Sequence, residues 1–240
     1  MVTFPLTTII FSTTFEAENI IEGRHMIPAR IYNEEWTVDA RLTETFGVSR
    51  DQLIQVVKEV VGARADAVEN DPITAAGQFA YIHGTRNVRA LFRTRGWNLF
   101  RKDNIELVRH PERDLTISYQ SVDLAASETH SPLAISGKGA GAERAIEEAQ
   151  LSLFKPDELA RPNPGALATI NTGMWFFCVS VVGDDVRAEL SLASGVSGGN
   201  FTGFIERIFI VKKGEWDNIR LGAGVDSDAV DFEPIITRKQ

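Results

Sequence analysis

The stretch MWFFCVSVVGDDVRAELSL, residues 174–192, contains two predicted strands and the turn that joins them. From Val186 to Leu192 every second residue is apolar, which is the period of a strand with one buried face. The residues VGDD, at 182–185, favour a turn, so the two strands are expected to form a hairpin. A third apolar run, FIERIFIVK at 204–212, follows the glycine-rich SGVSGGN. Together these runs predict a C-terminal antiparallel β-meander.

Upstream of this stretch the patterns are mainly helical. In VSRDQLIQVVKEVVG, residues 48–62, Ser49 and Gln52 have the spacing of a capping box, and Gly62 is a plausible end of the helix. A second helical region is expected over residues 74–95, with an interruption near Gly84. Short strands are expected at 105–108 and 115–122, and a further helix at 141–154.

These patterns predict an α+β protein, with a helix-rich N-terminal half that includes short strands, followed by the C-terminal antiparallel β-meander. The clearest break is KPDELARPNPG, residues 155–165, which holds three prolines. We therefore expect a mixed α+β region over residues 1–154, containing a basic stretch at 84–102, and an antiparallel sheet region over 166–240. The alternative is that both regions form one compact domain.

Composition narrows the class of protein. The chain has 240 residues, a formal net charge of −8 and one cysteine, Cys178, which lies in an apolar run and is expected to be buried. No apolar run approaches 18 residues, and no Lys or Arg precedes the apolar N-terminal residues. These features predict a soluble cytoplasmic protein that does not bind membranes. The acidic balance means that any binding of nucleic acid has to be local.

One local feature opposes the acidic balance. The stretch GTRNVRALFRTRGWNLFRK, residues 84–102, contains six basic residues and no acid. If residues 85–95 are helical, Arg86, Arg89 and Arg93 lie along one side, with apolar residues available for the core. The stretch is either a ligand site or a set of cations that pair with carboxylates elsewhere in the chain. Its basic residues are Arg86, Arg89, Arg93, Arg95, Arg101 and Lys102.

The leading interpretation is that this stretch binds nucleic acid, DNA or RNA, or a phosphate-rich ligand. Arginine suits bidentate contact with phosphate, and an exposed aromatic beside cations suits stacking on unpaired bases, for which Trp97 is the candidate. The loop SGKGAGAER, residues 136–144, adds glycines and Lys138 ahead of the predicted helix and is a second candidate for anion binding.

Two alternatives remain open. Asp185, Glu189 and Glu206 could converge across the predicted hairpins, as a Mg²⁺-dependent nuclease requires. The simpler account is that Glu189 or Glu206 pairs with Arg187 or Arg207 across strands. No other metal site or cofactor is expected, because the four histidines lack metal-ligand spacing. The other alternative is a non-catalytic interaction or assembly subunit, whose basic face meets an acidic protein partner or a second copy of the chain. Whether the protein is an enzyme is left undecided.

The segment ARLTETFGVSRDQLIQVV, residues 40–57, resembles helix-turn-helix DNA-binding domains, with Gly47 in the turn and apolar residues on either side of it. The resemblance implies that the second helix would enter the major groove of DNA. Charge opposes this implication, since residues 37–66 hold four basic and five acidic side chains.

Overall fold

The computed structural model describes residues 29–102, 105–136, 144 and 172–222 of the chain. The connector predicted at 155–165, nearly all of the helix predicted at 141–154, and Lys138 with its glycines lie outside the described residues. The described elements, in chain order, are β1 (Arg30–Tyr32), α1 (Glu35–Phe46), α2 (Arg50–Ala65), α3 (Ala75–Arg93), β2 (Asn98–Lys102), β3 (Ile105–Arg109), β4 (Leu115–Ser121), β5 (Gly173–Val182), β6 (Asp185–Ser197), β7 (Asn200–Val211) and α5 (Trp216–Gly222).

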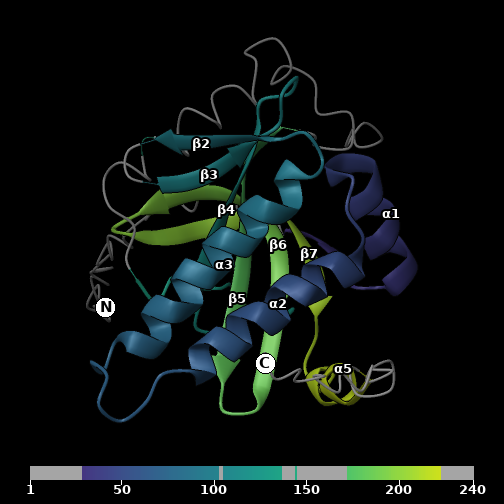
Figure 1. Ribbon diagram of the computed structural model, residues 1–240. Helices are drawn as coiled ribbons and strands as arrows, with labels where there is room; N and C mark the ends of the chain where they lie inside the picture. The colour runs from purple at the N-terminus through teal and green to yellow at the C-terminus, as the bar shows by residue number, and fades with distance from the viewer. Residues whose placement is uncertain (1–28, 103–104, 137–143, 145–171, 223–240) are drawn as a thin grey trace, which may run out of the picture.

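All seven described strands belong to one mixed sheet, in the order β1-β7-β6-β5-β4-β3-β2 (Figure 1). The neighbours β5, β6 and β7 are antiparallel to one another, as the hairpin pattern predicts. They do not form a separate antiparallel region, however, because β4 pairs in parallel with β5, and β1 pairs in parallel with β7. The prediction of helices and strands in an α+β arrangement holds, whereas the prediction of a purely antiparallel C-terminal sheet is wrong. Alternation within a strand reports which face is buried, not which distant strand pairs with it.

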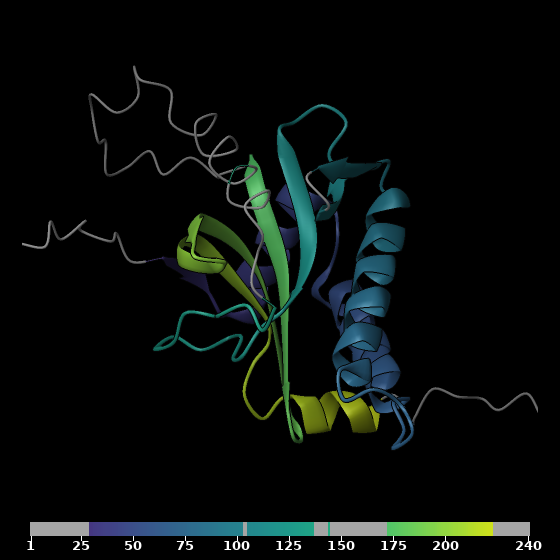
Figure 2. The same ribbon diagram turned by 90° about the vertical axis from the view of Figure 1, so that its left-hand side faces the viewer.

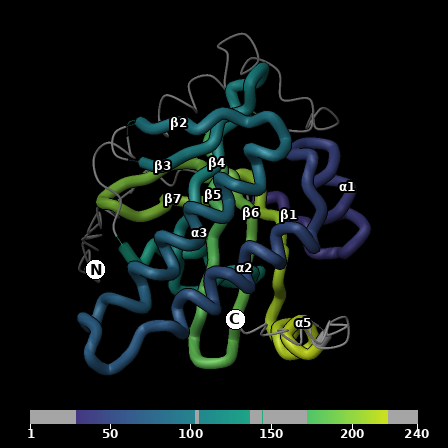
Figure 3. Tube along the Cα trace, in the orientation of Figure 1, coloured from purple at the N-terminus to yellow at the C-terminus, as the bar shows by residue number. Residues whose placement is uncertain are grey.

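Helices α2 and α3 cover one face of the sheet. Figure 2 shows the sheet edge-on with both helices on the same side of it, and Figure 3 shows the two helices side by side. The core between the layers contains apolar side chains from α2, such as Leu53 and Val57, and from the facing side of the strands, such as Ile117 and Trp175. Helical spacing on α2 and alternation on the strands thus place the two apolar surfaces in contact.

The opposite face of the sheet carries a second apolar cluster that includes Phe176, Phe201 and Phe204. Cys178 belongs to this cluster and is buried, which confirms the expectation of a buried thiol. Residues 122–136 pack against the same face, where Val122 and Ala134 form an isolated β-bridge. Within the described ranges no helix is long and apolar enough to cross a membrane.

The turn between α1 and α2 follows the sequence closely. The capping box forms: Ser49 Oγ accepts a hydrogen bond from the Gln52 backbone N–H, and the Gln52 side chain accepts one from the Ser49 N–H, at 3.3 and 3.1 Å. Gly47 ends α1 with a φ of +68°, a conformation that favours glycine. The exposed positions of α2 include Asp51 and Glu59, so this helix does not present the positive surface expected of a DNA-reading helix.

The expected interruption at Gly84 is wrong, because α3 runs unbroken from Ala75 to Arg93. Gly84 instead allows close packing of the helix on the sheet. A Cβ atom at this position would lie 2.4 Å from the ring of Tyr119 on β4. Tyr119 is itself buried, so its ring has little room to move. The same burial raises the pKa of its hydroxyl to about 12. The glycine therefore sets how closely α3 approaches β4.

We predict that Gly84→Ala lowers the free energy of unfolding by about 1–3 kcal/mol, because the methyl group overpacks the contact with Tyr119. The matched control is Gly77→Ala, in the same helix, where an added Cβ meets nothing within 4 Å. This control should raise the free energy of unfolding by about 0.5–1 kcal/mol through helix propensity. Urea denaturation of both variants tests the contact, and equal stabilisation by the two alanines would contradict it.

Candidate functional site

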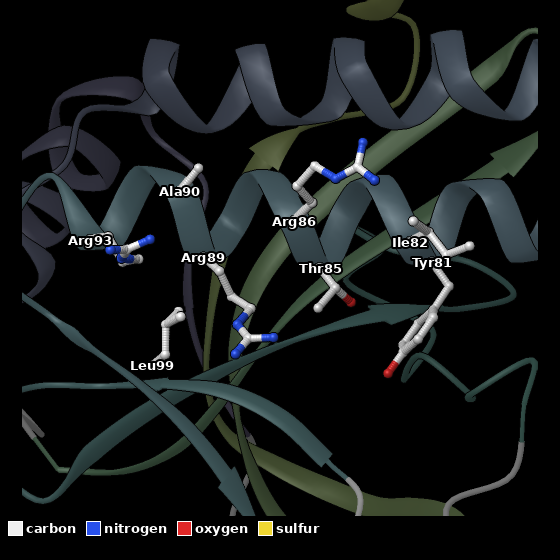
Figure 4. A pocket seen from close by; sticks show the side chains of 8 residues that line it. All are labelled: Tyr81, Ile82, Thr85, Arg86, Arg89, Ala90, Arg93 and Leu99. Atoms are coloured by element: carbon white, nitrogen blue, oxygen red, sulfur yellow. The ribbon is translucent and has the colours of Figure 1, made fainter.

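Helix α3 places Arg86, Arg89 and Arg93 away from the core. Val88 and Phe92, on the opposite side of the helix, are almost fully buried against the sheet. Figure 4 shows that the Arg89 side chain extends toward the strands, whereas Arg86 extends from the other side of the helix axis. Amphipathic spacing therefore produces the basic surface, as the sequence predicts.

A groove of about 430 Å³ lies along this surface, between α3 and β2. Two rows of side chains at a spacing of four residues line it, and Leu99 of β2 completes it (Figure 4). Three apolar side chains of the lining are open to solvent: Tyr81, Ile82 and Leu99 are 44%, 47% and 49% exposed. The two rows are Tyr81, Thr85, Arg89 and Arg93, and Ile82, Arg86 and Ala90. We call this site the α3–β2 groove.

The arginines of the basic stretch fall into two groups. Arg89 and Arg101 both pair with Glu106 on β3, and Arg101 Nε lies 2.6 Å from Glu106 Oε1. Arg86 and Arg93 are exposed and make no hydrogen bond or ion pair with any residue that the structure describes. The net charge of these four arginines together with Glu106 is +3. The reading as internal ion pairs therefore holds for Arg89 and Arg101, whereas Arg86 and Arg93 have no carboxylate partner among the described residues.

The rest of the basic stretch lies outside the α3–β2 groove. Arg95 is exposed and donates its Nε–H to the backbone oxygen of Gly47 at 2.9 Å, which ties the end of α3 to the turn between α1 and α2. Lys102 lies at the end of β2 and is half-buried. These two residues are brought near the groove by the chain but do not line it.

Trp97 is a core residue, with 5% of its surface exposed. Its ring packs against Phe92 and His110, with ring centroids 4.8 and 5.1 Å apart. The ring is therefore not accessible for stacking on a base, the role that its position in the sequence suggested. The aromatic side chain that does line the α3–β2 groove is Tyr81, which sequence reasoning missed. The signal was present, because Tyr81 lies four and eight residues before Thr85 and Arg89.

The floor of the groove contains two polar atoms without a partner. Thr85 Oγ1 and Arg89 Nε are buried, and neither forms a hydrogen bond within the part of the chain that the structure describes. Thr85 as a whole is 9% exposed. Buried donors and acceptors are nearly always hydrogen-bonded, so two unpaired atoms one helical turn apart in the same groove require an explanation.

The three carboxylates of the nuclease alternative do not converge. Glu189 is fully buried and forms a bidentate pair with Arg207 at 2.9 and 2.6 Å. Glu206 pairs with Arg41 of α1 at 2.6 Å, on the helix-covered face, while Glu189 shares the opposite face with Cys178. Burial raises the pKa of Glu206, and its hydrogen bond to Arg41 opposes that effect.

Asp185 is held by Arg187, at 2.6 Å, and this hydrogen bond lowers the pKa of Asp185. Each of the three carboxylates is thus neutralised by an arginine. The pair of Glu189 with Arg207 is one that the sequence suggested, whereas the sequence did not suggest Arg41 as the partner of Glu206. Across the described ranges no three His, Cys, Asp or Glu side chains gather as a metal site would require.

Comparison of the chain with protein-family models, with curated proteins and with solved structures finds no match.

Removal of one partner of the buried Glu189–Arg207 pair is predicted to destabilise the fold. Glu189→Ala should lower the free energy of unfolding by about 3–5 kcal/mol, because it leaves the Arg207 guanidinium buried without its carboxylate. Asp217→Ala, which removes an exposed pair with Arg220, should have a much smaller effect. Chemical denaturation of both variants measures the difference. Equal, small losses would show that Arg207 does not need this partner.

Proposed function

We propose that the protein binds nucleic acid, or a phosphate-rich ligand, through the α3–β2 groove. The observation that carries this proposal is the pair of guanidinium groups of Arg86 and Arg93, which form no ion pair with the described residues and lie beside the Arg89–Glu106–Arg101 cluster. In an acidic chain, arginines without such a pair are available to a ligand.

The chemistry of the side chains supports a phosphate ligand. A guanidinium group presents several N–H donors in a planar fork, which matches two oxygens of a phosphate. Arg86 and Arg93 are seven residues apart on α3, or about 10 Å along the helix axis. Two cations at this separation contact more than one phosphate of a strand. Such contacts give affinity without base recognition, so sequence preference should be weak.

The test is fluorescence anisotropy of labelled DNA and RNA with the double variant Arg86→Glu/Arg93→Glu, over a range of salt concentrations. Each phosphate contact contributes about 0.7 to 0.9 to the slope of log affinity against log salt, so the variant should lose about 1.5 from the slope and bind far more weakly. The matched control is Lys213→Glu/Arg220→Glu, which makes the same change in net charge at exposed positions outside the groove. The helix α5, which carries Arg220, lies far from β2 in both views (Figures 1 and 2).

Equal loss in both double variants would show that only net charge matters and would contradict a site at the groove. Absence of binding by the unmodified protein at low salt would favour the assembly alternative. That alternative is supported by β2, which ends the described part of the sheet and pairs there only with β3. Light scattering would then show a stable oligomer, or a complex with an acidic protein partner.

A further inference from the structure

We infer that the α3–β2 groove takes an unpaired nucleotide, so that the protein binds single-stranded nucleic acid in preference to a duplex. The base would lie against Tyr81 and Ile82, while the adjoining phosphates contact the arginines of the groove. This inference rests on the proposed function and names the form of nucleic acid that the same site selects.

Exposed apolar side chains in the groove are the first observation that favours a single strand. Tyr81 and Ile82 each expose nearly half of their surface at one end of the groove, and Leu99 does so at the other end, beside Arg89 and Arg93 (Figure 4). A duplex keeps the faces of its bases stacked inside, so it offers phosphates to the arginines but nothing to this apolar surface. An unpaired base offers a flat apolar face, and stacking on an aromatic ring is independent of sequence.

Tyr81 is placed to provide that ring. Its ring centroid lies 6.4 Å from that of Tyr119, at an interplanar angle of 55°, so buried Tyr119 supports one side. In Figure 4 the Tyr81 side chain extends along the strand-facing side of α3, the side from which Thr85 and Arg89 also project. A base at Tyr81 is therefore next to the polar floor and in the same row as Arg89 and Arg93, whereas Arg86 belongs to the neighbouring row.

The unpaired atoms of the floor are the second, independent observation. Thr85 Oγ1 can donate or accept a hydrogen bond, and Arg89 Nε can only donate. Base edges and sugar hydroxyls carry donors and acceptors that can pair with these two atoms. A phosphate backbone that contacts only the rim of the groove would leave the Thr85 hydroxyl without a hydrogen bond. The groove, about 430 Å³ in volume and open to solvent along α3, has space for one nucleotide, whereas a double helix would contact only its rim.

The first experiment compares anisotropy of a labelled single-stranded oligonucleotide with that of the same sequence as a duplex, using the full chain. Tyr81→Ala should weaken single-strand binding about tenfold and leave duplex binding unchanged. Tyr81→Phe, which keeps the ring, should restore the affinity. Trp36→Ala removes an exposed aromatic side chain of α1 outside the groove and should change neither affinity.

The second experiment uses Thr85→Val, which replaces the hydroxyl by a methyl group of similar size. Removal of an unpaired buried hydroxyl should raise the melting temperature by about 2–4 °C. The same variant should weaken single-strand binding about threefold, because the ligand loses a hydrogen bond. Stability and affinity thus move in opposite directions, a result that a purely structural threonine would not give.

The outcomes separate this inference from the proposal on which it rests. The single strand and the duplex could bind with equal, salt-dependent affinity that Tyr81→Ala does not change. This result would overturn the single-strand preference but would still agree with phosphate binding at the groove. Unchanged single-strand affinity in Thr85→Val would show that the Thr85 hydroxyl does not bind the ligand. No binding of either form by the unmodified protein would overturn the proposed function and this inference together.

Discussion

The contact of Gly84 with the Tyr119 ring is the constraint on which the arrangement of the site depends. Tyr119 stands on β4, which pairs in parallel with β5 at the centre of the sheet, so its position is fixed by the strands. Because a Cβ at position 84 would collide with this ring, α3 lies as close to the sheet as it does only with glycine there. The helix then runs beside β2 and β3, where Arg89 reaches Glu106 and Leu99 faces the helix.

Two buried ion pairs of β7 hold the remaining layers in place. Glu206 and Arg207 are adjacent residues and so point to opposite faces of the sheet. Glu206 binds Arg41 of α1 on the helix-covered face, whereas Arg207 binds Glu189 on the other face and donates hydrogen bonds to the backbone oxygens of Ser127 and His130. One strand thus anchors a helix on one side and residues 122–136 on the other. Buried pairs specify an arrangement more than they stabilise it, since desolvation offsets their attraction.

Local signals in the sequence predict local structure well here and distant contacts poorly. The capping box at Ser49 and the glycine at position 47 depend on neighbours within a few positions, and the structure confirms them. The alternation in residues 186–192 predicts the strand but not its burial, because Arg187, Glu189 and Ser191 are buried as well and both faces of β6 are covered. The parallel pairing of β4 with β5 joins segments more than fifty residues apart, and nothing in either strand encodes it. The sequence predicted only part of the groove. The row of arginines follows from helical spacing, but Glu106, the partner of Arg89, lies on β3, and the burial of Trp97 depends on Phe92 and His110.

The acidic balance of the chain contributes to the selectivity of such a groove. The net charge of the chain is −8, and the cluster at the groove carries +3, which leaves −11 for the rest of the protein. A polyanion that spreads beyond the groove meets this negative field, and the repulsion grows with the number of phosphates outside the basic patch. A duplex brings twice as many phosphates per unit length as a single strand, so it gains little more from the arginines and is repelled more by the surroundings. Under the proposed function, charge and apolar surface would therefore act in the same direction, each favouring a narrow ligand that places one unpaired nucleotide between α3 and β2.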